Sequence, residues 1–419
     1  MTAGLQADNT TLAQLARLQL SRFPENDGSE LLPYDAADSY LLEQLQLLLP
    51  DWPQRRILVI NDQFGALTLS LTVAQPTSVT DSFLAQQGCL ANARSNSLAT
   101  PAVQSVLQPL EGRYDAVLWR LPKSLAYMQD QIQRLIAPHS DEQTLLLTGG
   151  MVKHWANGHF AQLASLGDVQ KGLAVRKARV VQIVLQQEKL AAIPEPTLQE
   201  YTVADYGVHL REYANVFSQG HLDIGSRFLL ENLHRLTIEA AQPVIADLGC
   251  GNGILGVLAG RRFAEAELHF YDESFMALAT AGLSAEANLP GRERCHFHAG
   301  DGLAEVTPGS VDVVLNNPPF HQQQVVGDHI ARRMFAQAHQ ALRDQGVLWV
   351  VANRHLGYHQ RLQQLFGNVR QIAGNPKFVL LEAVKDNSYV PSRRFVEHDK
   401  GHKGQQQRNR QHRRPAAKR

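Results

Sequence analysis

The chain has 419 residues, of which 44% are hydrophobic and 7% aromatic, so it is too apolar for a disordered or fibrous protein and long enough for two or three domains. Its 40 basic residues equal its 40 acidic residues, so net charge alone indicates no function. The cysteines Cys89, Cys250 and Cys295 show no CxxC spacing, which favours neither a disulfide framework nor a zinc site. No apolar run fits a signal peptide or a membrane span, so we expect a cytoplasmic protein.

Two stretches of similar organisation lie on either side of a polar segment that contains Pro194 and Pro196. Each stretch alternates short β-branched runs with longer helix-like runs, which is typical of a parallel sheet with helices on both faces. We therefore predict an α/β protein with two tandem domains of this kind, at residues 1–187 and 201–386. The polar segment at 188–200 is the predicted linker.

The two predicted domains are also similar to each other in sequence. The segment DAADSYLLEQL at 35–45 aligns with DIGSRFLLENL at 223–233. Further matches follow in the same order: predicted strands at 57–60 and 244–246, the acids Asp81 and Asp272 closing a second strand, the acids Asp115 and Asp312 opening a third, and late strands at 179–185 and 378–384. An internal duplication explains this order, so both domains should share one topology.

The N-terminal domain has lost two segments that the C-terminal domain keeps. Where the second domain reads GCGNG at 249–253, the first reads NDQFG at 61–65 and retains one glycine of three. Where the second reads NPPF at 317–320, the first reads RLPK at 120–123. A loop without its glycines cannot bring backbone amides close to a ligand. We predict that residues 1–187 form a degenerate domain that acts as a scaffold or binds RNA.

A glycine-rich loop follows the first predicted strand of the second domain, in VIADLGCGNGILG at 244–256. Gly249, Gly251 and Gly253 permit a tight turn with close backbone approach, and the next helix offers free N–H groups at its N-terminus. The same residues fit the GxGxxG dinucleotide fingerprint. However, Asp247 would repel a pyrophosphate, whereas it can face the cationic end of S-adenosylmethionine. We predict S-adenosylmethionine as the cofactor.

Two further acids follow predicted strands of the second domain. Asp272 closes the strand at 268–271, where a carboxylate can accept hydrogen bonds from both ribose hydroxyls of a cofactor. Asp301 follows the strand at 295–298, where it can accept from the adenine amino group. The alternative for each acid is a helix N-cap. We predict that both contact the cofactor.

The segment NPPF follows the strand at 311–315, at the sheet edge where open α/β sheets place ligands. An exocyclic amino group on a base is a poor nucleophile because its lone pair is delocalised into the ring. Asn317 Oδ1 and the Pro318 carbonyl can accept both of its N–H bonds and aim the lone pair at a methyl donor, while Phe320 offers a ring face for the base. We predict these three residues as catalytic, with Asn317 also near the cofactor.

These motifs resemble those of class I methyltransferases of the NPPF/NPPY type. Within that group the chain resembles the bacterial ribosomal RNA guanine-N2 methyltransferases built from two tandem domains, and those acting on 23S rRNA more than those acting on 16S rRNA. The resemblance covers residues 15–385 and is carried by NVFS at 215–218, LDIGSR at 222–227, DLGCGNG at 247–253, NPPFHQQ at 317–323 and VANRH at 351–355.

The resemblance implies an α/β fold of two tandem Rossmann-like class I methyltransferase domains, the N-terminal one degenerate, and it implies an activity and a partner. It implies methyl transfer from S-adenosylmethionine to the N2 amine of one guanine in 23S rRNA, protein-free or at an early stage of assembly. Catalysis would lie in the C-terminal domain, and the N-terminal domain would help to bind RNA. It also implies that Phe217, Ser218 and Asp223 lie near the cofactor or the target base.

Two weaker features remain. The segment at 393–419 holds ten Lys or Arg against two acids and almost no apolar residue, so we expect a disordered basic tail at 387–419. It is either a solubilising extension or a phosphate-binding arm. In CHFH at 295–298, strand alternation sends Cys295 and Phe297 to one face and both histidines to the other, so we predict no metal site.

Several alternatives stay open at this point. An NPP turn presents the same acceptors to any planar amine, so the sequence alone also allows a 16S rRNA guanine-N2, an adenine-N6 or a protein-glutamine methyltransferase. A non-enzymatic ribosome-assembly factor that keeps the fold is a further alternative. The intact glycines and NPPF in one domain, beside their loss in the other, argue against that last possibility.

Overall fold

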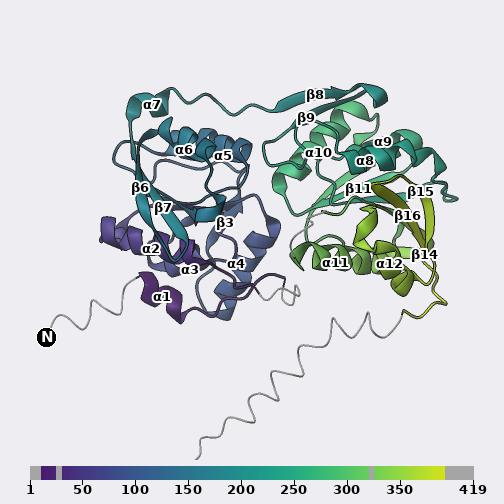
Figure 1. Ribbon diagram of the computed structural model, residues 1–419, viewed down its shortest axis with the longest axis horizontal. Helices are drawn as coiled ribbons and strands as arrows, with labels where there is room; N and C mark the ends of the chain where they lie inside the picture. The colour runs from purple at the N-terminus through teal and green to yellow at the C-terminus, as the bar shows by residue number, and fades with distance from the viewer. Residues whose placement is uncertain (1–10, 25–30, 320–324, 392–419) are drawn as a thin grey trace, which may run out of the picture. The chain divides into compact units, whose positions relative to one another are not determined.

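The computed structural model describes residues 11–24, 31–319 and 325–391, and it contains two seven-stranded sheets and a two-stranded one (Figure 1). The chain forms two compact units. Unit 1 consists of Met1–Leu222, Cys250–Val257 and Phe270–Asp301, and unit 2 consists of Asp223–Gly249, Leu258–His269 and Gly302–Arg419.

The first sheet lies in the N-terminal half and has the strand order β3-β2-β1-β4-β5-β7-β6. Its first five strands are parallel, whereas β7 is antiparallel to β5 and β6. The strands are β1 (Ile57–Ile60), β2 (Thr77–Thr80), β3 (Ala102–Ser105), β4 (Ala116–Arg120), β5 (Leu145–Met151), β6 (Gly167–Val175) and β7 (Ala178–Leu185). The α-helices of this half are α1 (Thr11–Arg17), α2 (Ala36–Leu48), α3 (Ala66–Ser70), α4 (Phe83–Ser95), α5 (Leu125–Gln131), α6 (Asn157–Ala164) and α7 (Gln187–Ala191).

The second large sheet has the strand order β12-β11-β10-β13-β14-β16-β15. Strands β10, β13 and β14 are parallel, and β16 is antiparallel to β14 and β15. The strands are β10 (Val244–Leu248), β11 (Glu267–Asp272), β12 (Cys295–Ala299), β13 (Val311–Asn316), β14 (Leu342–Asn353), β15 (Arg370–Gly374) and β16 (Phe378–Val384). The α-helices are α8 (Ile224–Glu231), α9 (Ile254–Arg262), α10 (Phe275–Asn288), α11 (Val325–Ala341) and α12 (Tyr358–Phe366). A hairpin of β8 (Gln199–Val203) and β9 (Val208–Glu212) precedes them.

The matching strand orders confirm the predicted fold class of two tandem Rossmann-like domains. The expectation of wholly parallel sheets was wrong for the last two strands of each sheet. Only Arg176 and Lys177 separate β6 from β7, and a connection this short cannot cross over to a parallel neighbour. Both residues have positive φ, as in the two-residue turns that suit β-hairpins.

The central strands of the N-terminal half are buried on both faces. Leu58, Ile60 and Trp119 belong to one buried cluster, whereas Ile57 and Val59 belong to another, so alternate residues of β1 serve different sides of the sheet. Burying each such side chain stabilises the fold by about 1.5–3 kcal/mol. This burial explains why β1 is a continuous apolar run rather than an alternating one.

An acid ties the start of the central strands together in both halves. Asp115 Oδ2 accepts a hydrogen bond from the Arg56 backbone N–H at 2.8 Å, and Asp312 Oδ2 accepts one from the Val244 backbone N–H at 2.7 Å. In the first sheet this bond joins the start of β4 to the start of β1, and in the second sheet it joins the start of β13 to the start of β10. The shared contact supports the internal duplication.

The second acid of the duplication aligns differently from the prediction. Ser82 caps α4 and Ser274 caps α10, so these two serines are equivalent positions. Thr80 Oγ1 accepts from the Ser82 N–H, as Asp272 Oδ1 accepts from the Ser274 N–H. Thr80, and not Asp81, is therefore the counterpart of Asp272. Asp81 corresponds to Glu273.

The remaining segments bear on the predicted boundaries. The predicted linker at 188–200 contains most of α7 and the first residues of β8. Of the predicted tail at 387–419, the residues after 391 lie outside the described part of the chain. Within the described ranges, no helix combines the length and the apolar character needed to span a membrane.

Asp81 is a buried carboxylate at the start of α10. Its Oδ2 accepts from Ser274 Oγ at 2.6 Å and from Asn215 Nδ2 at 2.8 Å, and its Oδ1 accepts from the Met276 N–H at 2.8 Å. Burial raises the pKa of Asp81 to about 7, although these hydrogen bonds oppose the shift. Unit 1 therefore holds a titratable group at the N-terminus of α10.

We expect the pH dependence of stability to reveal this carboxyl. Because the pKa of Asp81 is raised on folding, the folded protein binds the extra proton, and stability is lost as pH rises from about 4 to about 7. Asp81→Asn removes this contribution. Its free energy of unfolding relative to wild type should therefore rise by at most about 1.4 kcal/mol per pH unit in that window, measured by urea unfolding.

The control is Asp168→Asn, since Asp168 is exposed on β6. A pH-dependent difference that appears in Asp81→Asn and not in this control would identify Asp81 as its source. A flat difference for Asp81→Asn as well would show that Asp81 does not titrate in this window.

Candidate active site

The glycine-rich loop between β10 and α9 adopts the backbone conformations that its sequence predicts. Gly249, Gly251 and Gly253 have φ of 70°, 52° and 78°, a region that disfavours residues with a side chain. The Cys250 N–H donates to the Tyr271 carbonyl at 3.0 Å, which fixes the turn at the end of β11. The loop therefore presents its backbone at the carboxyl edge of the sheet.

The glycines of this loop serve different purposes. A Cβ on Gly253 would lie 2.8 Å from Ala281 Cβ, and one on Gly256 would lie 2.3 Å from the Phe270 ring, so both allow close packing. A Cβ on Gly251 would meet no described atom within 4 Å. Gly251 therefore borders open space, where a ligand can approach the backbone.

Asp272 lies against this loop. Its Oδ2 accepts from the Gly251 N–H and its Oδ1 from the Ser274 N–H, both at 3.0 Å. Burial raises the pKa of Asp272, although both backbone donors oppose the shift. Ser274 is the cap of α10, so Asp272 is not the helix N-cap that was its alternative role. A carboxylate oxygen has lone pairs left for a further donor.

Asp301 and Asp247 lie near the ends of β12 and β10, the strands on either side of β11. Asp301 is half-buried and follows β12, where the Gly300 N–H donates to the Asp272 carbonyl at 3.1 Å. Asp247 is 1% exposed and lies opposite Leu315 in the register of β10 and β13. Asp247 is therefore two positions in register from Asn317, the residue after β13.

Asn317 is held in one orientation. Its Nδ2 donates to Asp223 Oδ2 and to Ser226 Oγ, both at 2.9 Å. A carboxylate only accepts hydrogen bonds, so the amide must direct its NH2 toward Asp223 and its oxygen away from it. Asn317 Oδ1 is buried and has no hydrogen-bond partner among the described residues. The oxygen that was predicted to accept a hydrogen bond from the substrate is thus available for one.

The elements around Asn317 support this orientation. Asp223 is the N-cap of α8, where its Oδ2 also accepts from the Ser226 N–H at 2.9 Å. The preceding residue, Asn316, is fully buried and donates to the Leu248 carbonyl at 2.8 Å. The turn is therefore fixed to both α8 and β10. Pro318 is buried in this turn.

Three other predicted residues are less closely defined. Phe217 is 62% exposed, and Ser218 has a positive φ of 61° in the same loop. Phe320 lies outside the described residues. For Asp223 the structure adds a function that the sequence did not predict, which is to orient Asn317. The predicted contacts of Phe217, Ser218 and Asp223 with the cofactor or the target base remain predictions.

A buried network that was not predicted from the sequence supports the glycine-rich loop. Glu212 at the end of β9 is fully buried and accepts from Asn252 Nδ2 at 2.9 Å, Tyr201 OH at 3.0 Å and the Gly220 N–H at 2.8 Å. Asn252 belongs to the glycine-rich loop, and Gly220 follows the loop of Phe217 and Ser218. Glu212 thereby joins three segments. No local sequence pattern marks Glu212 for this role.

The equivalent site in the N-terminal half is filled by an ion pair. Arg120, at the position of Asn317 in the predicted alignment, donates to both oxygens of Asp35 at 2.9 and 3.0 Å, and Asp35 is the N-cap of α2. Although burial opposes it, Arg120 brings the pKa of Asp35 below its usual value, whereas burial raises the pKa of nearby Asp38 to about 6. This half keeps the frame of the site but offers no free acceptor in place of Asn317 Oδ1.

Comparisons with protein families match both halves of the chain. The family described as "RLMG N-terminal domain" matches residues 9–187, and the family described as "Methyltransferase small domain" matches residues 207–382. A ribosomal RNA large subunit methyltransferase G from Pseudomonas syringae pv. tomato is 43% identical over 384 residues, which are 89% of this chain and 99% of the relative. Its namesake from Streptomyces griseus is 41% identical over 377 residues, 88% of this chain and 97% of the relative.

A solved structure shares the two-domain fold. The 16S rRNA N2 methyltransferase of T. thermophilus, in complex with AdoMet and guanosine, superposes with a TM-score of 0.68 and covers 90% of this chain and 100% of that chain. At 21% sequence identity, this similarity establishes the fold alone.

The two loop glycines allow a matched test. Gly253→Ala introduces both an unfavourable φ and a close contact with Ala281, so it should lower the free energy of unfolding by about 2 kcal/mol or more. Gly251→Ala introduces only the unfavourable φ and should cost about 1–2 kcal/mol. Its methyl group should instead weaken binding of the predicted cofactor at least about tenfold, measured by calorimetry. Equal stability and equal affinity in the two variants would contradict these roles.

Proposed function

Because the chain belongs to the family of ribosomal RNA large subunit methyltransferase G, we propose that it transfers a methyl group from S-adenosylmethionine to the exocyclic N2 amine of one guanine in 23S rRNA. The observation that carries the proposal is the buried Asn317 Oδ1, which lacks a partner among the described residues while its Nδ2 is held by Asp223 and Ser226. An acceptor prepared in this way suits an N–H donor on the substrate.

The turn acts on the amine of the base. Asn317 Oδ1 and the Pro318 carbonyl accept its two N–H bonds, which favours a pyramidal nitrogen with an exposed lone pair. The Asp223 carboxylate keeps the amide from rotating, because the opposite orientation would place two oxygens face to face. No strong base is needed, since the methylated amine loses a proton readily. Phe320 is proposed to stack on the base.

The cofactor site is proposed at the glycine-rich loop. S-adenosylmethionine, when bound, supplies an electrophilic methyl group on a sulfonium. Gly251 leaves space for close approach to the backbone, and Asp272 offers carboxylate oxygens for the ribose hydroxyls. Asp247 faces the cationic end of the cofactor, and Asp301 accepts from the adenine amino group. The buried acids and the open glycine fit this molecule.

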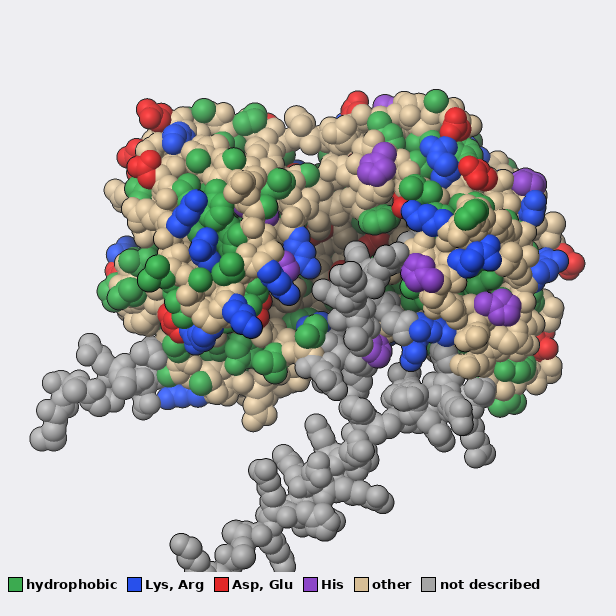
Figure 2. All heavy atoms as spheres, viewed as in Figure 1, with side chains coloured by type: hydrophobic (Ala, Val, Ile, Leu, Met, Phe, Trp, Pro, Cys, Tyr) green, Lys and Arg blue, Asp and Glu red, His purple; other side chains and the backbone are tan. Residues whose placement is uncertain are grey.

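The N-terminal half is proposed to bind RNA without catalysing a reaction. Lys123 and Lys153 are exposed beyond the ends of β4 and β5. Burial lowers the pKa of His154, and the charges of both lysines lower it further. Both lysines therefore act on the same side chain, His154, as Arg120 and Asp35 also do. The face drawn in Figure 2 carries Lys and Arg side chains together with some Asp and Glu side chains. Clustered cations suit a phosphate backbone.

The proposed substrate is 23S rRNA that is protein-free or at an early stage of assembly. Such a substrate places the reaction in the cytoplasm.

Incubation of the full-length protein with labelled S-adenosylmethionine and purified, protein-free 23S or 16S rRNA tests the activity. We expect N2-methylguanosine in 23S rRNA alone. Asn317→Ala should reduce the rate about 100-fold or more while cofactor binding is retained, because it removes one acceptor from the reacting amine. Ser226→Ala should reduce it less, since Asp223 still holds the amide.

Other products would correct the proposal. Label in 16S rRNA would identify the small subunit as the substrate, N6-methyladenosine would identify a different base, and label in protein glutamine would identify a peptide substrate. An Asn317→Ala variant with an unchanged rate would exclude the proposed catalytic turn.

A double variant tests the RNA-binding role. Lys123→Ala with Lys153→Ala should weaken binding of 23S rRNA and reduce the dependence of log affinity on log salt by up to about two, because two phosphate contacts are lost. The control is Arg55→Ala with Arg113→Ala, which removes the same charge near the starts of β1 and β4, at the opposite edge of the sheet. Equal affinities and salt slopes for both double variants would argue against this surface.

A further inference from the structure

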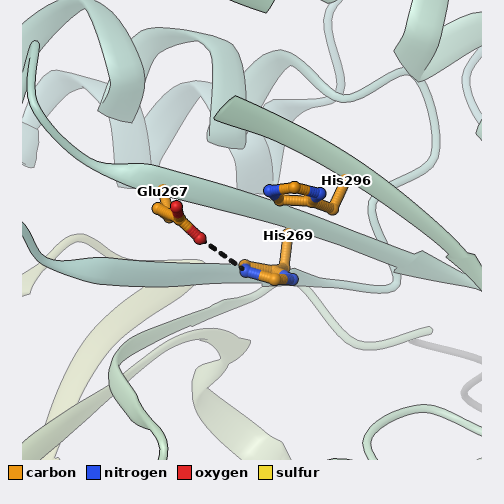
Figure 3. A group of neighbouring side chains, drawn as sticks. All are labelled: Glu267, His269 and His296. Carbon is orange, nitrogen blue, oxygen red and sulfur yellow. Dashed lines mark ion pairs between the residues drawn. The ribbon is translucent and has the colours of Figure 1, made fainter. Parts of the chain in front are cut away.

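Three potential metal ligands converge on β12 and β11, the first two strands in the order of the second sheet, away from the NPP turn. Glu267 and His269 lie on β11, and His296 lies on β12, the edge strand (Figure 3). One carboxylate oxygen and one ring nitrogen of each histidine all lie within 4.8 Å of one another. Glu267 Oε2 and His269 Nε2 are 3.7 Å apart.

Strand geometry explains the convergence. Phe297 stacks on Phe270 with ring centroids 5.0 Å apart, and His298 stacks on Tyr271 with centroids 4.6 Å apart. Residues two apart on a strand share a face, so His296 lies on the face of His298, and Glu267 and His269 lie on that of Tyr271. The expectation that CHFH forms no metal site considered β12 alone. The neighbouring strand supplies the other two ligands.

We propose that Glu267, His269 and His296 bind one Zn²⁺ ion. Two imidazoles and one carboxylate form a ligand set that zinc accepts, with a fourth position for water or another group. Zinc holds such ligands at about 2.0–2.2 Å, which places them about 3.4 Å from one another. The side chains must therefore close by about 1 Å, and Glu267, which is 52% exposed, has room to do so.

The ion pair of Glu267 with His269 is the simplest alternative to a metal site. A metal ion would join β11 to β12 through all three side chains. These are the strands that end near Asp272 and Asp301. The proposed ion would therefore stabilise the edge of the sheet that carries both acids, and it goes beyond the methyl-transfer reaction.

Zinc titration of the untagged full-length protein, stripped of metal and set against a competing chelating dye, tests the site. We expect one ion per chain at this site, with an affinity at least about tenfold lower in His269→Ala and His296→Ala. The matched control is His359→Ala, which removes an exposed histidine of α12 and should bind zinc like wild type. Equal affinities in all three variants would overturn the proposal.

A second measurement avoids dependence on folding of the alanine variants. Glu267→Gln preserves the shape of an exposed side chain and removes the anionic ligand, so it should melt at the wild-type temperature in chelator. Added Zn²⁺ should raise the melting temperature of wild type more than that of Glu267→Gln. An equal rise in both would show that zinc binds elsewhere and that Glu267, His269 and His296 do not form a zinc site.

Discussion

A helix-capping carboxylate fixes the side chain at the carboxyl end of the fourth strand of each large sheet, Asn317 after β13 and Arg120 at the end of β4. In the C-terminal half, Asp223 caps α8 and orients the Asn317 amide, so that the free oxygen is directed away from the carboxylate. In the N-terminal half, Asp35 caps α2 and binds Arg120 instead. The same frame therefore holds an acceptor in one half and a cation in the other. That single exchange separates a turn with a free acceptor from a turn in which an ion pair takes its place.

Much of this arrangement could be predicted from the sequence because it is local. The glycine turn, the NPP segment and the order of strands follow from short patterns and from the similarity of the two halves. The one-residue offset between Thr80 and Asp81 could not, since both residues are polar and only the helix cap at Ser82 fixes the alignment. The network of Glu212 depends on contacts between segments far apart in the sequence. The proximity of His296 on β12 to Glu267 and His269 on β11 could not be predicted either, because side-chain alternation along one strand does not show which residues the adjacent strand places beside it.

Hydrogen-bond partners decide which acids can serve a ligand. Glu212 is surrounded by donors from three segments and has a structural role, whereas Asp272 accepts two backbone N–H groups and keeps lone pairs for a further donor. Charge alone does not distinguish these acids in the sequence. Their hydrogen-bond partners do, and those partners come from the loop and helix geometry around each acid.

Residues 81–83 and 273–275 contact each other reciprocally. The Phe83 N–H donates to the Glu273 carbonyl at 2.7 Å, and the Phe275 N–H donates to the Asp81 carbonyl at 2.9 Å. Reciprocity of this kind characterises the interface of a symmetric homodimer. Here both contacting segments belong to one chain, so the contact is independent of protein concentration. Covalent fusion also frees each side to evolve separately, which identical subunits cannot do, and the chain has Asp81 on one side and Glu273 on the other.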